Sequence, residues 1–388
     1  MKLKYLKFMM IALAFLVVLA ACGGEEASGP TETDDTPLTE DVDPTEDEDD
    51  EEDNEVTDGD VNVALIAHSP DSILDDGSFN QGAWDGIQQF ISSHGGEANF
   101  FQPHEASDEA RIGLIQEAIT TGGANVLVLP GFHFETALYE AQGLFPEATF
   151  VLLDASPRNA AGEAVINNNV AAIHYAEEEA GFLAGYAAVM EGYRELGFMG
   201  GIAVPAVVRF GHGFIQGADY AAASLGLAEG DVTLNFTYLG GFAPDPNHTV
   251  TSAAWFEGGT EVIFTAAGGA GGSVMSAAES AGTSVIGVDV DQSGLSDSVI
   301  TSAIKGLNVS VYDMLVNFMN GTFTGGGELR FDASNYGVGL AMESSNFTNF
   351  TQAQYEEIFA SLRDGEITVI SSLELEDIPV SLVTLVEL

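Results

Sequence analysis

Beyond residue 60, short runs of β-branched and aliphatic residues alternate with segments of helical periodicity. In the segment 78–93, for example, Phe79, Ala83 and Ile87 fall on one helical face. Such alternation predicts parallel β-sheets flanked by helices, which is an α/β fold. The expected strands are residues 61–67, 126–129, 149–153, 169–173, 196–202, 232–239, 262–265, 284–288 and 380–386. The expected helices are residues 78–93, 135–144, 177–190, 207–225, 250–256 and 272–281, with another that starts near residue 352.

These elements form two successive sets of similar size, and the segment 61–388 is longer than one hydrophobic core usually supports. We therefore expect two doubly wound lobes with a hinge near residues 173–176. The expected N-terminal lobe is 61–173 and the expected C-terminal lobe is 174–300. Residues 301–388 would then supply crossover segments that complete both lobes.

The N-terminal segment predicts export. Lys2, Lys4 and Lys7 precede an apolar stretch at 8–20 that is short for a membrane span but typical of a signal peptide. The sequence Leu-Ala-Ala-Cys at 19–22 resembles the lipobox of secreted lipoproteins, so residues 1–22 are expected to be a lipoprotein signal peptide. Cys22, the chain's one cysteine, is then the lipidation site, and the protein is held on the extracytoplasmic face of the cell membrane. The alternative is an ordinary signal peptide with an incidental cysteine.

Residues 23–60 are dominated by Glu, Asp, Thr, Pro and Gly. Such a segment cannot bury enough apolar surface to fold, and its like charges keep it extended. We expect an acidic disordered linker between the anchor and the folded part.

Charge excludes several partners. The formal net charge is −50 at pH 7, and beyond residue 22 the chain has six arginines and one lysine, Lys305. A strongly acidic surface argues against nucleic acid and against anionic substrates. A single retained lysine near a strand end suggests a cation that is needed there, although an incidental surface lysine is the alternative.

In open α/β sheets, ligands bind outside the carboxyl ends of the strands. The residues just after each expected strand are therefore the candidates for ligand contacts. They lie at 75–80, 130–131, 154, 209–210, 266–272 and 289–291.

The densest candidate segment is 75–86, Asp-Asp-Gly-Ser-Phe-Asn-Gln-Gly-Ala-Trp-Asp-Gly. Asp76 or Ser78 can cap the helix that follows by accepting a hydrogen bond from its first free N–H groups. Asn80 offers both a donor and an acceptor, which suits the edge of a nucleobase. Phe79 and Trp84 can stack on a ring, but they can equally fill the core of the lobe.

This segment resembles the opening motif of the basic-membrane-protein family, the nucleoside-binding lipoproteins of ABC transporters. Further stretches resemble that family in the same order. They lie at 150–154, 169–174, 179–185, 197–201, 209–214, 266–271, 286–292, 301–305 and 311–313. Each motif is weak alone, but their common order over about residues 61–340 is specific.

The resemblance implies a type I periplasmic-binding-protein-like fold with a ligand cleft between the lobes and no catalysis. It also implies that Asp154 and Asn80 contact a base, and that Phe210 stacks on it from the second lobe. His212 departs from the family, which often has an acidic residue at that position.

For the sugar, the resemblance implies that Asp289 accepts hydrogen bonds from ribose hydroxyls and that Lys305 sits beside it. The backbone at Gly268 and Gly269 would approach the same ring. Independently, Asp289 and Asp291 follow an expected strand, and vicinal hydroxyls suit a carboxylate because it only accepts. The alternative is that both aspartates cap the turn that follows.

Neither a metal nor a cofactor is expected. The segment 289–294 imitates half of a calcium loop, but Ile300 stands where the bidentate glutamate should be. The glycines at 268–272 have neither the ending of a P-loop nor the spacing of a dinucleotide fingerprint.

The sequence thus predicts a solute-binding lipoprotein of an ABC importer that binds a nucleoside, with a purine base expected. Its expected partners are that small molecule, the transporter permease and the membrane through the lipid anchor. One alternative is a receptor or sensor domain for a small ligand such as a sugar or riboflavin. Another is a secreted nucleoside hydrolase, but no aspartate cluster for a metal follows the first expected strand.

Overall fold

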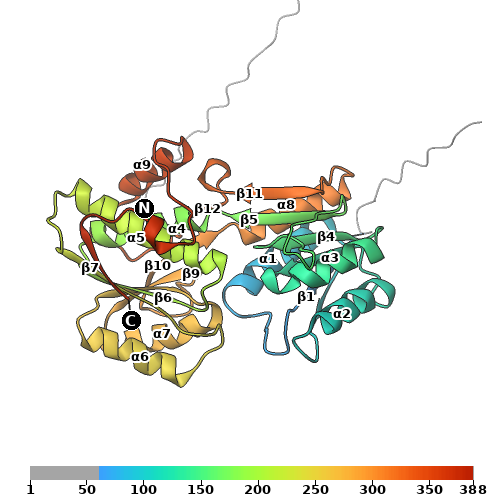
Figure 1. The fold of residues 1–388 in the computed structure, drawn as a ribbon, viewed down its shortest axis with the longest axis horizontal. Helices are drawn as coiled ribbons and strands as arrows, with labels where there is room; N and C mark the ends of the chain where they lie inside the picture. The colour runs from blue at the N-terminus through green and yellow to red at the C-terminus, as the bar shows by residue number, and fades with distance from the viewer. Residues whose placement is uncertain (1–60, 388) are drawn as a thin grey trace, which may run out of the picture. The chain divides into compact units, whose positions relative to one another are not determined.

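The computed structural model describes residues 61–387 and contains two β-sheets (Figure 1). The predicted signal peptide, Cys22 and the predicted linker 23–60 lie outside the described residues. The first sheet has the strand order β11-β5-β4-β3-β1-β2, and all of its neighbouring strands are parallel. Its strands are β1 (Asn62–Ile66), β2 (Glu97–Phe101), β3 (Val126–Pro130), β4 (Thr149–Leu153), β5 (Val170–Tyr175) and β11 (Gly327–Phe331).

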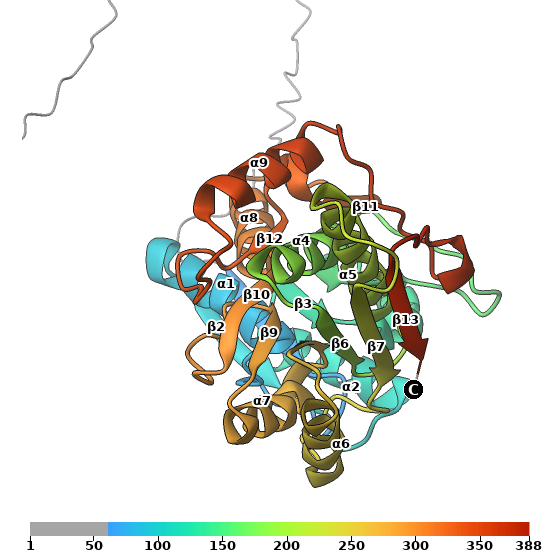
Figure 2. The same cartoon turned by 90° about the vertical axis from the view of Figure 1, so that its left-hand side faces the viewer.

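The second sheet has the order β12-β10-β9-β8-β6-β7-β13. Its neighbours are parallel except for the antiparallel pair β10–β12. Figure 2 shows the late strand β13 beside β7 at one edge. The strands are β6 (Glu195–Gly200), β7 (Val232–Tyr238), β8 (Val262–Ala266), β9 (Ser284–Asp289), β10 (Val299–Lys305), β12 (Val338–Leu340) and β13 (Val383–Glu387).

Helices cover both faces of each sheet because the buried strand residues alternate between two cores. In the first sheet, Val63 and Val128 pack toward α1 while Ile66 and Leu127 pack toward α2 and α3. In the second sheet, α4 and α5 lie on one face and α6 and α7 on the other (Figure 2). The helices are α1 (Phe79–His94), α2 (Asp108–Thr120), α3 (Glu135–Leu144), α4 (Glu177–Glu191), α5 (Pro205–Ser224), α6 (Pro246–Glu257), α7 (Gly271–Ala281), α8 (Leu307–Met319) and α9 (Gln352–Arg363). Short 3₁₀ turns lie at η1 (Phe132–Phe134), η2 (Gly268–Ala270), η3 (Ala333–Asn335) and η4 (Leu375–Asp377).

The described chain passes between the two sheets three times. It leaves the first sheet after β5 and enters α4, it returns after β10 into α8, and it leaves again after β11 to form β12. Helix α8 packs against α1, which is more than 200 residues earlier in the sequence. Each sheet with its helices is one lobe, so the prediction of two doubly wound α/β lobes is confirmed.

Helices α4 and α5 pack so closely that residues with side chains could not stand at the points of contact. A Cβ atom added to Gly181 would overlap the carbonyl oxygen of Phe210, and one added to Gly213 would overlap that of Glu178. These glycines therefore let the two helix backbones touch. Within residues 61–387, no helix has the length and apolar character needed to cross a membrane.

Candidate functional site

Asp154 and Asp289 occupy equivalent places in the two lobes. Asp154 directly follows β4 in the first sheet, and Asp289 ends β9 in the second. Both have left-handed backbone conformations, with φ values of 60° and 67°. Left-handed residues other than glycine are uncommon and concentrate at functional sites. The carboxyl ends of the two sheets thus each present one unusual aspartate.

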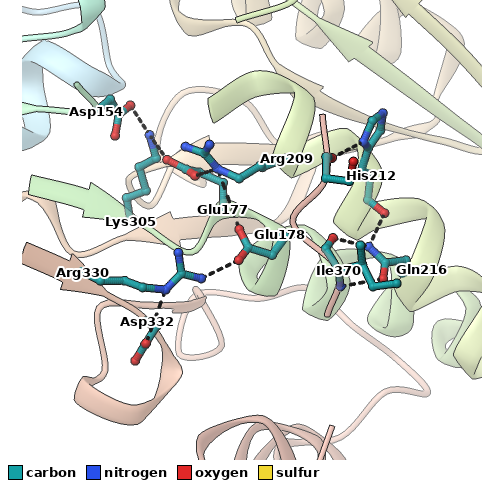
Figure 3. A network of polar contacts seen from close by, with 11 residues as sticks. Asp154, Glu177, Glu178, Arg209, His212, Gln216, Lys305, Arg330, Asp332 and Ile370 are labelled. Carbon is teal, nitrogen blue, oxygen red and sulfur yellow. Dashed lines mark hydrogen bonds and ion pairs between the residues drawn. The ribbon is translucent and has the colours of Figure 1, made fainter. Parts of the chain in front are cut away.

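The side chain of Lys305 lies between these two aspartates. Its Nζ atom is 2.5 Å from Oδ2 of Asp154, 3.2 Å from Oε1 of Glu177 and 4.0 Å from Oδ1 of Asp289. Only 2% of the Lys305 side chain is exposed. Figure 3 shows Lys305 reaching from the end of β10 toward Asp154 and Glu177. A buried ammonium requires paired charges of this kind, because it has lost its hydration.

Three aromatic rings surround the same ammonium. Its distances to the ring centroids of Phe79, Tyr175 and Phe210 are 4.9, 5.3 and 5.4 Å. All three lie within the range of a cation–π contact. Phe79 begins α1 in the first lobe, and Phe210 belongs to α5 in the second. We call Asp154, Glu177, Asp289 and Lys305, together with these rings, the Lys305 cluster.

Direct hydrogen bonds join the lobes at the cluster. The hydroxyl of Ser78, just before α1, donates to Oδ2 of Asp289 at 2.5 Å. Nε2 of Gln292 donates to the carbonyl oxygen of Gly77 at 2.8 Å. The carboxyl ends of both sheets are therefore held together by polar contacts.

Burial and charge decide the protonation of the cluster. Burial raises the pKa of Asp154 to about 7, although Lys305 acts in the opposite direction. Burial alone would also raise the pKa of Glu177, but the charges of Lys305 and Arg209 outweigh it and lower that pKa. Burial would lower the pKa of Lys305, but the three carboxylates raise it above its ordinary value. Lys305 and Glu177 are thus charged, while Asp154 can gain or lose a proton near neutrality.

Two carboxylate oxygens of the cluster are buried without a hydrogen-bond partner among the described residues, and one of them, Oε1 of Glu177, has its ion pair with Lys305. Oδ1 of Asp154 is shielded from solvent and has no hydrogen-bond partner among the described residues. Buried polar atoms are seldom left unpaired, because an unmade hydrogen bond is costly. The free oxygen can accept a hydrogen bond from a ligand, or donate one when the carboxyl is protonated.

The sequence matches a family model over the same residues. The Bmp model, described as ABC transporter substrate-binding protein PnrA-like, matches residues 61–371. The chain belongs to the Bmp family. The resemblance to the basic-membrane-protein family is thereby confirmed, and this Bmp protein is a substrate-binding protein of the ABC transporter type.

Individual relatives match most of the chain. The ABC transporter nucleoside-binding protein BmpA of Lactococcus lactis subsp. cremoris is 27% identical over 392 residues, which cover 95% of this chain and 99% of that protein. The CD4+ T-cell-stimulating antigen of Listeria monocytogenes is 25% identical over 330 residues, covering 80% of this chain and 88% of that protein.

Solved structures show the fold. An ABC transporter solute-binding protein from Aeropyrum pernix has a TM-score of 0.64 at 23% identity and covers 79% of this chain and 87% of its own. One from Conexibacter woesei has the same TM-score at 20% identity, with coverages of 80% and 99%. The expected type I periplasmic-binding-protein-like fold is confirmed.

Of the residues predicted for the site of this Bmp protein, six lie together. They are Ser78, Phe79, Asp154, Phe210, Asp289 and Lys305. They come from both lobes and, apart from Phe210 in the second turn of α5, from strand ends or helix starts, as the carboxyl-end rule for α/β sheets predicts.

The other predicted residues of segment 75–86 make structural contacts. Asp76 accepts backbone hydrogen bonds from Ser78, Asn80 and Gln81, at 2.9, 3.0 and 3.1 Å, and so caps α1. Nδ2 of Asn80 donates to Oγ of Ser72 and to the carbonyl oxygen of Ile73. Trp84 packs, partly buried, against the core. These contacts match the capping and packing alternatives for this segment.

Gly268 and Gly269 form the turn η2 after β8. Gly268 has a φ of 54°, and both glycines lie close to the loop at Phe242 and Pro244. The positive φ favours glycine at 268, and a Cβ added to Gly269 would lie 3.3 Å from the carbonyl oxygen of Phe242. Cys22 lies outside the described residues.

Sequence reasoning missed Tyr175 and Glu177 as members of the cluster. Glu177 opens a run of three glutamates at 177–179, which resembles the acidic first turn that many helices have. Arg209 was selected as a strand-end residue, but its ion pair with Glu177 was not foreseen. Its Nε atom lies 2.6 Å from Oε2 of Glu177. Glu177 differs from an ordinary glutamate in a first helical turn by its complete burial. This burial is visible only in the folded structure.

The size of a cavity does not identify the site. A cavity of about 560 Å³ lies along the outer side of α5, lined by residues that include Val208, His212, Tyr238 and Leu373. It contains none of the Lys305 cluster. Across residues 61–387, no three His, Cys, Asp or Glu side chains are grouped as metal ligands.

Proposed function

We propose that this Bmp protein binds a purine nucleoside between its lobes and delivers it to an ABC importer. The observation that carries the proposal is the Lys305 cluster, which joins one aspartate from each lobe to a buried cation and two phenylalanine rings. The printed name of the Lactococcus relative supports a nucleoside as the ligand.

Each half of a nucleoside has suitable partners in the cluster. Asp289 can accept hydrogen bonds from two ribose hydroxyls, with Lys305 beside it as a donor. The free Oδ1 of Asp154 can bond the edge of the base. Phe79 and Phe210, one from each lobe, offer aromatic faces for stacking.

Charge favours a nucleoside over a nucleotide. Lys305 faces Asp154, Glu177 and Asp289, and Arg209 is engaged by Glu177. A phosphate would therefore meet buried carboxylates and find no free cation in the cluster. Like charges at such short range repel strongly in a buried site.

We further propose that the protein is anchored by a lipid on Cys22 and works outside the membrane, with residues 23–60 as a flexible spacer. Its lobes would be residues 61–173 and 174–300, completed by 301–388. We also infer that the ligand is bound and released unchanged. The cluster aspartates support this inference, because they are engaged by Lys305 and Ser78.

Calorimetry tests the proposal. The full chain should bind inosine, guanosine or adenosine at one site. Inosine monophosphate should bind at least tenfold more weakly, which corresponds to about 1.4 kcal/mol of binding free energy. Chromatography of the mixture after incubation should recover intact nucleoside. Binding of ribose or riboflavin in preference to all nucleosides, or release of free base, would contradict it.

A further inference from the structure

We propose that Glu177 is a positioning residue that fixes the Lys305 ammonium between the two lobes, so that ligand affinity depends on the Glu177 charge. This inference rests on the proposed nucleoside site and assigns a residue that the sequence did not single out.

Glu177 bridges two cations from two other elements. Its Oε1 atom is 3.2 Å from Nζ of Lys305, and its Oε2 atom is 2.6 Å from Nε of Arg209. Its side chain is fully buried. A buried carboxylate is tolerated only when charges compensate it on both sides, and Figure 3 shows Glu177 lying between the two cations. Contact with both carboxylate oxygens thus fixes the positions of the Lys305 and Arg209 side chains.

The supports of Glu177 are rigid. It is the first residue of α4, directly after the chain crosses from β5 into the second lobe. Arg209 lies in α5, and the backbones of α4 and α5 touch where Gly181 meets Phe210, the residue after Arg209. Neither helix can shift without moving the other. Glu177 therefore transmits the position of this helix pair to Lys305.

Lys305 itself lies at the second crossing, where β10 ends and the chain returns to the first lobe. Its ammonium reaches Asp154 in one lobe and Asp289 in the other. Without the Glu177 charge, the ammonium would be held only by the two aspartates that the ligand must also contact. Glu177 thus leaves the aspartates free to exchange partners with a ligand.

Glu178 provides a matched control in the same helical turn. It is also buried, but its carboxylate pairs with Nη2 of Arg330 at 2.5 Å and lies 3.8 Å from Nε of Arg209. It has no ion pair with Lys305 among the described residues. Glu178→Gln therefore removes a buried charge at the neighbouring position without removing an ion-pair partner of Lys305.

The affinity of the full chain for inosine should be measured from pH 5 to 9 for the native protein, Glu177→Gln and Glu178→Gln. We expect Glu177→Gln to weaken binding about tenfold or more, in line with hydrogen bonds to charged groups. Glu178→Gln should change the affinity by less than about twofold, which is about 0.4 kcal/mol, because the Glu178 carboxylate pairs with Arg330 and not with Lys305.

The pH profile separates positioning from general destabilisation. The charged groups that face Asp154 are Lys305 from β10, Glu177 from α4, Asp289 from β9 and Arg209 from α5. Among them, the negative charge of Glu177 raises the pKa of Asp154. Removing that charge should shift the Asp154 titration, and with it the midpoint of the binding profile, to lower pH. Glu178→Gln should leave the midpoint unchanged. Glu177→Asp keeps the charge, but its side chain is too short to contact both Lys305 and Arg209. This variant should keep the midpoint of the binding profile and still bind inosine more weakly.

A measurement without ligand makes the inference independent of the proposed function. Lys305 is the only lysine beyond residue 7, so its ¹⁵N-labelled ammonium can be assigned by its loss in Lys305→Met. The protons of the Lys305 ammonium should exchange with water faster in Glu177→Gln than in the native protein or Glu178→Gln, because one of its three carboxylate partners has lost its charge.

Native-like affinity, binding midpoint and Lys305 proton exchange in Glu177→Gln would overturn the inference. If that variant does not fold, native affinity in Glu177→Asp would overturn it equally. A native protein that binds no nucleoside would instead refute the proposed function, and the proton exchange of Lys305 would still decide the role of Glu177.

Discussion

Lys305 shows how much of this site depends on single residues. Beyond the predicted signal peptide the chain keeps one lysine among many carboxylates, and that lysine is buried between the lobes. Three carboxylates hold its charge, and three aromatic rings surround it. Electrostatic interactions at such depth are strong because little water screens them.

Asp289 provides the first prediction at this scale. Its left-handed φ of 67° suits Asn far better than Ala, so Asp289→Asn removes the charge with little backbone strain. We expect at least tenfold weaker inosine binding, because a hydrogen bond from a ligand to a charged acceptor contributes about 1.5–3 kcal/mol. Native protein should bind 2′,3′-dideoxyinosine comparably poorly.

The two losses should not add, because both remove the same contacts. Asp291→Asn is the control, since the Asp291 carboxylate accepts from the backbone of Ser293 in the exposed turn. Equal affinity of the native protein for inosine and its dideoxy analogue would remove the ribose role from Asp289.

Phe210 provides the second prediction. It is 2% exposed and makes an edge-to-face contact with Phe264, at a centroid distance of 5.8 Å. Phe210→Leu keeps apolar volume but removes the aromatic face, and stacking of a base is worth about 1–3 kcal/mol. Inosine binding should therefore weaken roughly 5- to 150-fold. Phe264→Leu, equally buried but outside the Lys305 cluster, should lower Tm without this loss of affinity.

Residue patterns predicted the site residues at strand ends but not all of the residues that contact them. Asp154 and Asp289 were found because they follow apolar strands, and Lys305 because it is the one lysine beyond residue 22. Glu177 was missed because its acidic neighbours look like an ordinary helix start. Its distance to Lys305 depends on how β10 and α4 meet although the two residues are 128 positions apart, which no local pattern specifies.

At the scale of elements, the packing of α4 on α5 determines where Glu177 and Arg209 meet. Gly181 and Gly185 of α4 face the backbone of α5, and Gly213 and Gly217 of α5 face that of α4. Small residues at a helix contact allow the backbones to approach closely. The site therefore depends on residues that never touch it.

Gly217→Ala should destabilise the protein, because the new Cβ would overlap the carbonyl oxygen of Phe182. Overpacking of this kind typically costs about 1–3 kcal/mol. Gly113→Ala is the matched control, since this exposed glycine of α2 has nothing within 4 Å of its Cβ position. It should be neutral or stabilise the protein by up to about 1 kcal/mol, as helix propensity predicts. Thermal unfolding of both variants measures the difference, and an unchanged Tm for Gly217→Ala would contradict the close helix contact.

Most elements were predictable from apolar periodicity, but β2, β10, β11, β12, α2 and α8 were not among the expected elements. Three of these exceptions have a clear physical cause. Strand β2 lies at the edge of the first sheet and is incompletely buried, so its apolar pattern is weak. Helix α2 buries only Arg111, Ile115 and Ala118, so it lacks a clear apolar face. Strand β12 has three residues. Such elements are formed by their neighbours and leave little trace in the sequence.

At the scale of the whole molecule, the three chain crossings converge on charged residues. Glu177 follows the first crossing, Lys305 precedes the second, and Arg330 lies in the strand before the third. Under the proposed function, opening of the lobes would break the ion pair between Lys305 and Asp154 and the hydrogen bond between Ser78 and Asp289, which join them.

The membrane anchor is a prediction for the whole molecule. Cys22→Ser should move the protein from the membrane fraction into the soluble exported fraction, because the acylated thiol would be lost. Fractionation followed by immunoblotting measures the change, and labelling with a fatty acid should be lost in parallel. Retention of the variant on membranes to the native degree would refute a lipid anchor at Cys22.

Ligand selection from a mixture tests the central claim most directly. The full chain should be incubated with equimolar nucleosides, ribose, other sugars and riboflavin, then desalted, denatured and analysed by mass spectrometry. The Lys305 cluster predicts one purine nucleoside retained per chain, and its loss in Asp289→Asn. Retention of a sugar or of riboflavin, or of no compound at all, would contradict a nucleoside site between the lobes.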